Sequence, residues 1–277
     1  MSVRSARYNL LSLRNPKGLT VIPEERDAWA FLDAAAITSS RQQRAVIELV
    51  RGLKHAQLWT KMKAIYPFVG GTATTHKYNL KDPRDADAAF RLTFNGGWTH
   101  ASTGGLPNGT NAYADTFFIP SSQLSSSSAH LTIYNRSDTN NQATDFGSIG
   151  SGSNRFLIHA RYDGTAYADC FNFNTNRISI LQSSSTGYYV VTRNSSTSLK
   201  LFRNNAQIGS TITNTSSGLT SVTFSMGIAA YNSSTGFAGF NDRECAFVTL
   251  GDGLTDTDAT NLYNIVQRFQ TSLGRQV

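Results

Sequence analysis

The glutamates of this sequence are placed in a way that argues against glycoside hydrolysis. That reaction uses two carboxyl groups positioned about the scissile bond. Glucanases with a β-sandwich fold carry two Glu and one Asp on one strand, at a spacing of two that puts them on one face. No Glu-x-Asp-x-Glu pattern occurs here, and Glu244 is the only glutamate beyond residue 48. We therefore expect no catalytic residue, and an aspartate-based enzyme acting on polysaccharide stays as an alternative.

The histidines and aspartates do not show the spacing of metal ligands. No two of the five histidines stand at the H-x-x-x-H spacing of a zinc site. Asp252, Asp256 and Asp258 resemble part of a calcium loop, but Thr257 and Tyr263 stand where an EF-hand needs Gly and Glu. We expect a helix cap here and no metal site. A looser calcium site on loops is left open.

The remaining reactive groups give no motif for a cofactor or a nucleophile. The loop Gly150-Ser151-Gly152-Ser153 lacks the lysine of a phosphate-binding loop, and no Gly-x-Ser-x-Gly elbow precedes a helix. Cys170 and Cys245 lie in strand-like stretches with phenylalanines nearby, which predicts buried, unreactive thiols. We expect no bound cofactor.

Aromatic residues give the one positive indication of a binding site. Trp98, Tyr113 and Tyr231 lie in or beside loop-like stretches rich in Gly and Asn, as do Phe117 and Phe118. Exposed rings with Asn and Asp neighbours suit sugar binding, because a ring stacks on the apolar face of a sugar while the polar groups bind its hydroxyls. We therefore name Trp98, Tyr113 and Tyr231 as candidate ligand-binding residues. Packing in the core is the alternative for each ring.

Positive charge is concentrated at the start of the chain. The formal net charge is +7, and residues 1–63 carry eleven Lys/Arg against five Asp/Glu, which leaves +1 for the rest. This pattern indicates either an acidic partner or a solvated helix face. Nucleic acid is an unlikely partner, because the sequence shows no stacking aromatics in a basic groove. No stretch approaches the ~20 apolar residues of a membrane span, so we expect no membrane partner.

The elements that must position these groups fall into three regions. Residues 1–23 hold no sustained hydrophobic period and predict an extended N-terminal arm. Residues 24–63 predict a helical anchoring segment of two helices, and residues 64–277 predict a β-sandwich domain with a closing C-terminal helix. A helical pair this short cannot bury its apolar stripe alone. It must pack on the next domain or on another chain.

Capping signals mark where the helices begin. Pro23 stands just ahead of the first helix, and Ser39 with Gln42 has capping-box spacing before the second. Thr255, with Asp258 three residues on, is placed to cap the C-terminal helix. That helix carries a clean amphipathic stripe and is expected to pack against the sandwich or the Trp59 region.

Residues 64–250 have the pattern of an antiparallel sandwich. Short alternating segments are separated by turn clusters at a spacing near ten residues. Residues 188–191 and 199–202, joined by a polar turn, predict a hairpin. We therefore predict a mainly β fold: an antiparallel sandwich with an N-terminal helical anchor and a C-terminal helix.

Several motifs of this sequence are similar to those of one known class of proteins. The first runs from Leu58 to Gly71 and ends in Tyr66-Pro67-Phe68-Val69-Gly70-Gly71. The others are His76-Lys77-x-Asn79-Leu80-Lys81-Asp82-Pro83, Phe94-x-Gly96-Gly97-Trp98-Thr99, Asn108-Gly109-Thr110-Asn111-x-Tyr113-Ala114-Asp115-Thr116 and the closing segment from Val266 to Arg275. These motifs resemble virion proteins of tailed bacteriophages, especially those that infect Bacteroidetes, and the resemblance extends over roughly residues 25–277.

The β region also resembles the concanavalin-A-like, or laminin-G-like, sandwich. Leu201-Phe202-Arg203-Asn204-Asn205-Ala206 stands where that superfamily has a Leu-Tyr-x-Asn-Gly hairpin. Asn205 replaces the usual Gly, and Asn also tolerates a positive φ, so the turn is expected to survive. The segment from Ala246 to Thr255 is similar to the last strand of that fold, which leads into a terminal helix. The resemblance implies that the predicted sandwich is a concanavalin-like jelly roll.

The resemblance implies a non-enzymatic structural component of the virion, in a tail, a fibre or a capsid decoration. The N-terminal region would anchor it to other virion proteins, and the sandwich would face outward and contact host surface glycans. Copies of the chain would form a homo-oligomer such as a trimer. Two alternatives remain: a free carbohydrate-binding module, and an enzyme of lectin-like or glucanase-like fold. The resemblance carries over no catalytic residue.

Overall fold

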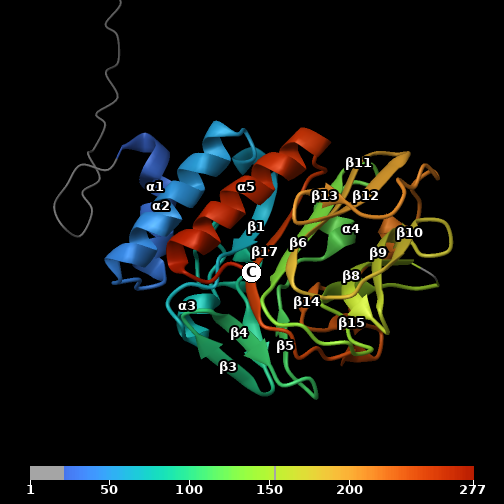
Figure 1. The fold of residues 1–277 in the computed structure, drawn as a ribbon, viewed down its shortest axis with the longest axis horizontal. Coiled ribbons are helices and arrows are strands. Elements are labelled where there is room, and N and C mark those ends of the chain that lie inside the picture. Colours follow the sequence, from blue (N-terminus) through green and yellow to red (C-terminus); the bar gives the residue numbers. More distant parts are fainter. Residues whose placement is uncertain (1–21, 153) are drawn as a thin grey trace, which may run out of the picture.

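The computed structural model describes residues 22–152 and 154–277. In this part of the chain two β-sheets pack face to face, and three helices lie on the outer side of one sheet (Figure 1). The predicted fold class, a mainly β antiparallel sandwich with N-terminal helices and a C-terminal helix, is confirmed. The predicted arm at residues 1–23 lies outside the described residues except for its last two.

The first sheet has eight strands. Its strands, in spatial order, are β13 (Ala206–Gln207), β12 (Ser198–Arg203), β11 (Gly187–Ser195), β6 (Ala129–Asn135), β17 (Cys245–Gly251), β4 (Gly104–Pro107) and β3 (Trp98–Ala101), and β1 (Met62–Tyr66) pairs with β17. All of these pairs are antiparallel. The predicted hairpin of residues 188–191 and 199–202 is confirmed as β11 and β12, with Val190 opposite Phe202.

The second sheet has nine strands. Their spatial order is β10 (Arg177–Leu181), β9 (Thr165–Asn172), β8 (Asn154–Tyr162), β7 (Phe146–Ile149), β14 (Gly227–Ile228), β5 (Tyr113–Asp115) and β2 (Thr93–Asn95). The hairpin of β15 (Tyr231–Ser233) and β16 (Gly236–Ala238) joins this sheet through a parallel pairing of β15 with β7. The space between the two sheets is filled by a core that includes Phe146, Phe156 and Val248.

Three helices cover the outer face of the first sheet: α1 (Arg26–Ala34), α2 (Ser40–His55) and α5 (Asp256–Leu273). The short helices α3 (Ala73–His76) and α4 (Pro120–Gln123) lie in loops, as do 3₁₀ turns at Pro23–Glu25, Trp59–Lys61, Asp87–Ala89 and Leu219–Ser221. No helix in the two described ranges has the length and hydropathy needed to cross a membrane.

The helices and the outer face of the first sheet share a second hydrophobic core. Leu49 of α2 and Phe269 of α5 belong to the same buried cluster as Phe247 of β17. The predicted division between residues 63 and 64 does not follow a structural boundary, because β1 runs across it. The apolar stripe of residues 24–63 therefore packs on the sheet of its own chain, one of the two places expected for it.

Local signals in the sequence set several of the turns and helix starts. The Ser39 hydroxyl accepts a hydrogen bond from the Gln42 backbone N–H at 3.5 Å, and Thr255 and Asp258 form a reciprocal capping box. Asn204 and Asn205 have φ values of +47° and +69°, so this hairpin turn does survive without glycine. These three predictions are confirmed.

Candidate functional site

The second sheet has an outer face that points away from the first sheet. The helices α1, α2 and α5 lie on the first sheet, so none of these three covers that face. Those helices pack against side chains that point away from the sandwich core on the first sheet, such as Tyr134 and Phe247. Figure 1 shows the helices on one side of the molecule and β8, β9 and β10 on the other. A ligand that contacts the sheet itself therefore has access from the side of the second sheet.

Strand pairing aligns side chains into rows across that outer face. Tyr231 pairs with Gly147, Gly147 with Leu157, Leu157 with Asp169, and Asp169 with Arg177. Residues directly opposite one another in a sheet share a face. The alternation of side chains puts Arg155 and Tyr167 on this face as well, because Phe156, Ala166 and Ala168 point into the core.

Two arginines and two aromatic rings form an alternating stack on the face. The guanidinium carbon of Arg155 lies 4.0 Å from the ring centroid of Phe173, and that of Arg177 lies 4.4 Å from the same centroid. On its other side Arg177 lies 4.6 Å from the ring centroid of Tyr167. All four side chains are half-buried. With Tyr231 they define what we call the arginine–aromatic face: Arg155, Tyr167, Phe173, Arg177 and Tyr231.

Asp169 fixes the central arginine of the stack from below. Its two carboxylate oxygens accept hydrogen bonds of 2.7 and 2.6 Å from Nε and Nη2 of Arg177, and its side chain is fully buried. A bidentate pair of this kind sets the plane of the guanidinium as well as its position. Arg177 is therefore held in one orientation, and the negative charge of Asp169 balances its positive charge.

Arg155 differs from Arg177 because it has no acidic partner within ion-pairing distance among the described residues. Its Nε atom is buried and has no hydrogen-bond acceptor there. Burial lowers the pKa of Arg155, and the neighbouring Arg177 lowers it further, whereas Asp169 and Tyr231 raise it. The two Nη atoms of Arg155 are not closed to solvent and form no hydrogen bond with a described residue, so donors remain on this half-buried side chain.

The predicted residues Tyr113 and Tyr231 both lie on this side of the second sheet. Tyr113 stacks on Phe237 of β16, with 3.9 Å between ring centroids and 15° between ring planes. Gly227 of β14 leaves the room for Phe237, because a Cβ there would lie 2.7 Å from the Phe237 ring. Tyr231 is half-buried and lies over Gly239. The sheet therefore brings two of the three predicted rings to one face.

Trp98 lies elsewhere, at the edge strand β3 of the first sheet. Its ring packs edge-on against Phe94, with 5.2 Å between centroids, and beside His100. The indole N–H donates a 3.2 Å hydrogen bond to the Tyr113 carbonyl. Trp98 is half-buried against the sandwich core, and Phe118 is wholly inside it. For these two rings the structure shows the alternative of core packing.

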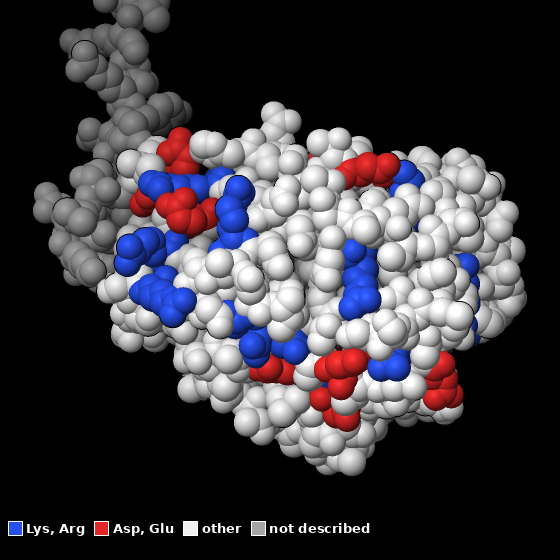
Figure 2. Space-filling model, viewed as in Figure 1, with Lys and Arg blue, Asp and Glu red and all other residues white. Residues whose placement is uncertain are grey.

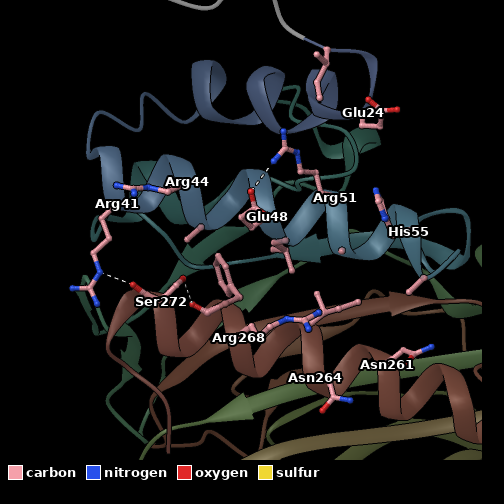
Figure 3. Close-up of a pocket in the computed structure, with 17 residues that line it drawn as sticks. Glu24, Arg41, Arg44, Glu48, Arg51, His55, Asn261, Asn264, Arg268 and Ser272 are labelled. Atoms are coloured by element: carbon pink, nitrogen blue, oxygen red, sulfur yellow. Dashed lines mark hydrogen bonds and ion pairs between the residues drawn. The ribbon is translucent and has the colours of Figure 1, made fainter.

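A second surface feature is a groove of about 1240 Å³ between α2 and α5, shown in Figure 3. Its walls carry Arg41, Arg44, Glu48, Arg51, His55, Asn261, Asn264, Arg268 and Ser272. Arg51 pairs with Glu25 and Glu48, and Arg41 donates to the Ser272 carbonyl. Among the described residues Arg44 and Arg268 form no ion pair, so the groove has a positive balance. Figure 2 shows this basic character on the helical side, with acidic residues interspersed.

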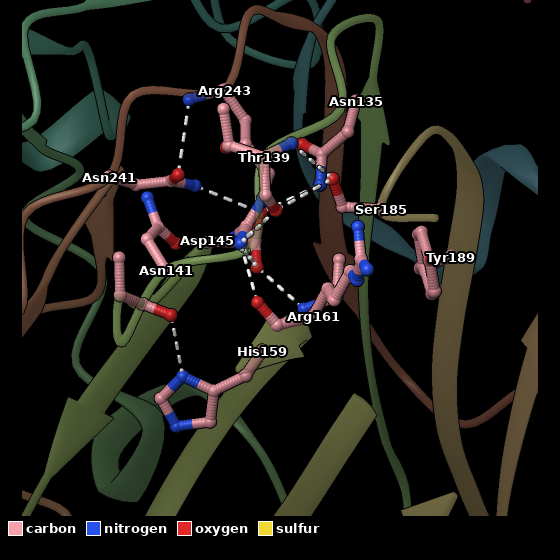
Figure 4. A network of polar contacts seen from close by, with 12 residues as sticks. Asn135, Thr139, Asn141, Asp145, His159, Arg161, Ser185, Tyr189, Asn241 and Arg243 are labelled. Atoms are coloured by element: carbon pink, nitrogen blue, oxygen red, sulfur yellow. Dashed lines mark hydrogen bonds and ion pairs between the residues drawn. The ribbon is translucent and has the colours of Figure 1, made fainter. Parts of the chain in front are cut away.

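A buried polar network holds the end of the second sheet in place (Figure 4). Asp145 and Arg243 form an ion pair of 3.0 Å, and neither side chain is exposed. Asn135, Asn241 and the Ala160 backbone N–H also donate to the Asp145 carboxylate. Because the Asp145 carboxylate is paired, hydrogen-bonded at both oxygens and closed to solvent, the network is structural. It positions β8, which carries Arg155.

Sequence reasoning missed Arg155, Phe173 and Arg177. Each lies in a segment where polar and apolar residues alternate, and that alternation was the available signal for a strand with one outward face. The strand register that places Arg155 and Arg177 on either side of one ring is a long-range property. The stretch around Asp256, for which the sequence predicts a helix cap, forms the N-terminus of α5. No group of three or more His, Cys, Asp or Glu able to hold a metal occurs within residues 22–152 and 154–277.

Solved structures resemble this fold at low sequence identity. Domain 4 of AbnA, a GH43 extracellular arabinanase from Geobacillus stearothermophilus solved with arabinotriose, superposes with a TM-score of 0.53 at 13% identity, covering 73% of this chain and 98% of that domain. At this identity the match shows the shared β-sandwich fold alone. No protein-family model matches the chain, and no curated protein matches it in sequence.

Two further similarities are partial. The binding domain of botulinum neurotoxin serotype D/C has a TM-score of 0.49 at 10% identity, over 76% of this chain and 53% of that one. The NanB sialidase of Streptococcus pneumoniae has a TM-score of 0.46 at 14% identity, over 61% of this chain and 27% of the sialidase. This chain thus spans about half of the toxin domain and a quarter of the sialidase, and we draw no conclusion from either.

Proposed function

We propose that this protein is a non-enzymatic structural component of a bacteriophage virion, and that its β-sandwich binds a glycan of the host surface at the arginine–aromatic face. The observation that carries the proposal is the stack of Arg155, Phe173, Arg177 and Tyr167 on the exposed side of the second sheet. The arabinanase domain that shares the fold was solved with arabinotriose, which adds support for a sugar ligand.

The chemistry of the face suits a sugar. Half-buried rings offer apolar surface to the C–H groups of a pyranose or furanose, and guanidinium N–H groups donate to hydroxyl oxygens. The bidentate contact with Asp169 holds Arg177 in place before a ligand arrives. Because Arg177 is already ordered in the free protein, ligand binding does not lose free energy in ordering it.

The same geometry favours contact over hydrolysis. Arg155, Tyr167, Phe173, Arg177 and Tyr231 include no carboxylate, and the carboxylate beneath them, Asp169, is fully buried and tied to Arg177. Hydrolysis of a glycosidic bond by the usual route needs two carboxyl groups that reach the scissile bond. We therefore propose binding without catalysis.

The virion half of the proposal is supported by the sequence motifs and by the opposite placement of two surfaces. The helices lie outside the first sheet, and the arginine–aromatic face lies outside the second (Figure 1). A protein held to a particle by its basic helical side would present the sugar-binding face outward. We propose an acidic surface of another virion protein as the attachment partner, with copies of this chain arranged as an oligomer such as a trimer.

Glycan-array binding of the full chain tests the sugar-binding half. We expect the wild type to bind host-surface glycans, and Phe173→Ala to lose at least about tenfold in affinity because it removes the ring that both guanidiniums share. Leu106→Ala is the matched control, since Leu106 is an exposed apolar residue of the first sheet. Equal losses in the two variants, or no glycan binding by the wild type, would contradict the proposal.

Labelling of intact phage particles tests the virion half. An antibody against the chain should decorate the particle at fixed positions, and light scattering of the purified protein should give the mass of an oligomer. A chain that is monomeric and absent from the particle would remove this half of the proposal while leaving the sugar-binding half open to its own test.

A further inference from the structure

We infer that the glycan bound at the arginine–aromatic face carries an anionic group, and that Arg155 is the residue that binds this group. The inference rests on the proposed function. It adds the chemical class of the ligand and the specificity-determining residue.

The two arginines of the stack are in different electrostatic states. The charge of Arg177 is matched by Asp169 through two short hydrogen bonds. Among the described residues no carboxylate approaches Arg155 to within ion-pairing distance, although Arg155 stacks on the same ring. The three groups Arg155, Arg177 and Asp169 therefore leave one positive charge, and it resides on Arg155.

Arg155 also has unmet hydrogen-bonding capacity. Its Nε–H is buried and lacks an acceptor in the described part of the chain. A ligand cannot reach that buried atom. The two Nη atoms of Arg155 are not closed to solvent and form no hydrogen bond with a described residue, so they are the donors available to a ligand.

The geometry favours an anion over a neutral hydroxyl as the acceptor. A guanidinium laid flat on a ring keeps its edge available, and that edge matches the two oxygens of a carboxylate or the oxygens of a sulfate or phosphate. Tyr231, one row away across the sheet, supplies a ring on the same face for the sugar that carries the anion. A hydroxyl would accept one hydrogen bond and leave the charge unmatched.

Carboxylate, sulfate ester and phosphate share this chemistry, and the test separates them. The full chain is titrated with oligosaccharides of one backbone in four forms: carboxylate-bearing, the same carboxyl as its methyl ester, sulfated and phosphorylated. We expect at least one anionic form to bind about tenfold or more tightly than the neutral ester, as a charge-assisted hydrogen bond predicts. Added salt should reduce the difference in affinity between the anionic and the neutral forms, because it screens the charge of Arg155.

Variants assign the preference to Arg155. Arg155→Gln should bind the anionic and neutral forms with equal affinity while keeping its thermal stability, and Arg155→Lys should recover part of the preference because it keeps the charge without the planar fork. Arg84→Gln is the control, because it removes the same charge from an exposed residue whose recorded partner is Asp82.

The outcomes separate the two proposals. Equal binding of the anionic and neutral forms by the wild type, or an unchanged preference in Arg155→Gln, overturns the inference and leaves sugar binding standing. If the wild type binds none of the forms and no glycan on an array, the proposed function fails and the inference fails with it.

Discussion

Asp145 and Arg243 form an ion pair of 3.0 Å in which neither side chain has any exposure to solvent. Asp145 lies just before β7, and Arg243 just before β17, so the pair joins the approaches to the two sheets. Arg243 also donates to the carbonyl oxygens of Thr139 and Arg161. The pair thus holds the loop after β6 against the C-terminal end of β8. Arg155 lies near the N-terminal end of the same strand.

Removal of one partner of this pair should be strongly destabilising. Asp145→Ala leaves the Arg243 charge buried without its partner, and we expect the free energy of unfolding to fall by about 3–5 kcal/mol. Urea unfolding followed by tryptophan fluorescence measures the change. Arg84→Ala breaks an exposed, solvent-screened pair and should change the stability little. Similar losses in the free energy of unfolding for the two variants would show that the buried pair contributes no more to stability than the exposed one.

Two buried histidines should make the protein less stable in mild acid. Burial, with His100 and Arg275 nearby, lowers the pKa of His76 from 6.5 to about 3, and burial lowers that of His130 to about 4. The unfolded chain takes up protons near 6.5 and the folded chain does not. Their stabilisation is therefore complete above about pH 6.5 and is lost as the pH falls toward 4.

The pH dependence can be measured as the free energy of unfolding at pH 7.5 and pH 4.5. We expect a loss on the order of a few kcal/mol between the two values. His76 and His130 contribute to it, as do His100 and His159, whose pKa values burial also lowers. His76→Gln should shrink the loss, because Gln does not titrate while its amide remains able to accept from the Gly71 N–H, as the His76 Nε2 does at 3.1 Å. An unchanged loss in this variant would exclude His76 as its source.

Gly227 tests the aromatic contact between Tyr113 and Phe237. A Cβ at residue 227 would lie 2.7 Å from the Phe237 ring, so Gly227→Ala should push Phe237 off Tyr113. We expect a cost of about 1–3 kcal/mol, as for other overpacked sites. Thermal unfolding gives the stability, and near-UV circular dichroism should lose part of its tyrosine signal. Wild-type stability with an unaltered spectrum would argue against this stacking.

Both cysteines should resist thiol reagents in the native protein. Cys170 and Cys245 are buried and unpaired, and burial raises the pKa of both, that of Cys170 to about 12. The thiolate is the reactive form, so burial and a raised pKa both slow the reaction. We expect no reaction with an aromatic disulfide reagent over minutes in buffer, and rapid reaction of both thiols in denaturant. A fast native phase would show that one thiol is accessible.

The sequence predicts the fold wherever the signal is local. The caps at Ser39 and Thr255 depend on groups three residues away, and the turn at Asn204-Asn205 depends on what those residues tolerate at positive φ. The packing of the helices on their own sheet was one of two open options. Deciding between them needed the register of β1 with β17, which joins residues about 185 positions apart, such as Ile65 and Thr249.

The candidate site depends almost wholly on such distant pairings. Tyr113 and Tyr231 could be chosen from their Gly- and Asn-rich surroundings, and the sheet does bring both to one face. Trp98 has the same kind of surroundings, yet its indole is held against the core by Phe94. The contacts of Phe173 with Arg155 and Arg177 follow from the β8–β9–β10 register, which residue spacing alone does not give.

The central claim is that the outer face of the second sheet binds the glycan. Amide chemical shifts of the full-length protein, recorded during titration with the tightest glycan from the array, test it most directly. We expect the largest shifts at Arg155, Tyr167, Phe173, Arg177 and Tyr231, with little change in α2 and α5. Shifts concentrated in the groove between α2 and α5, or around Trp98, would contradict the claim.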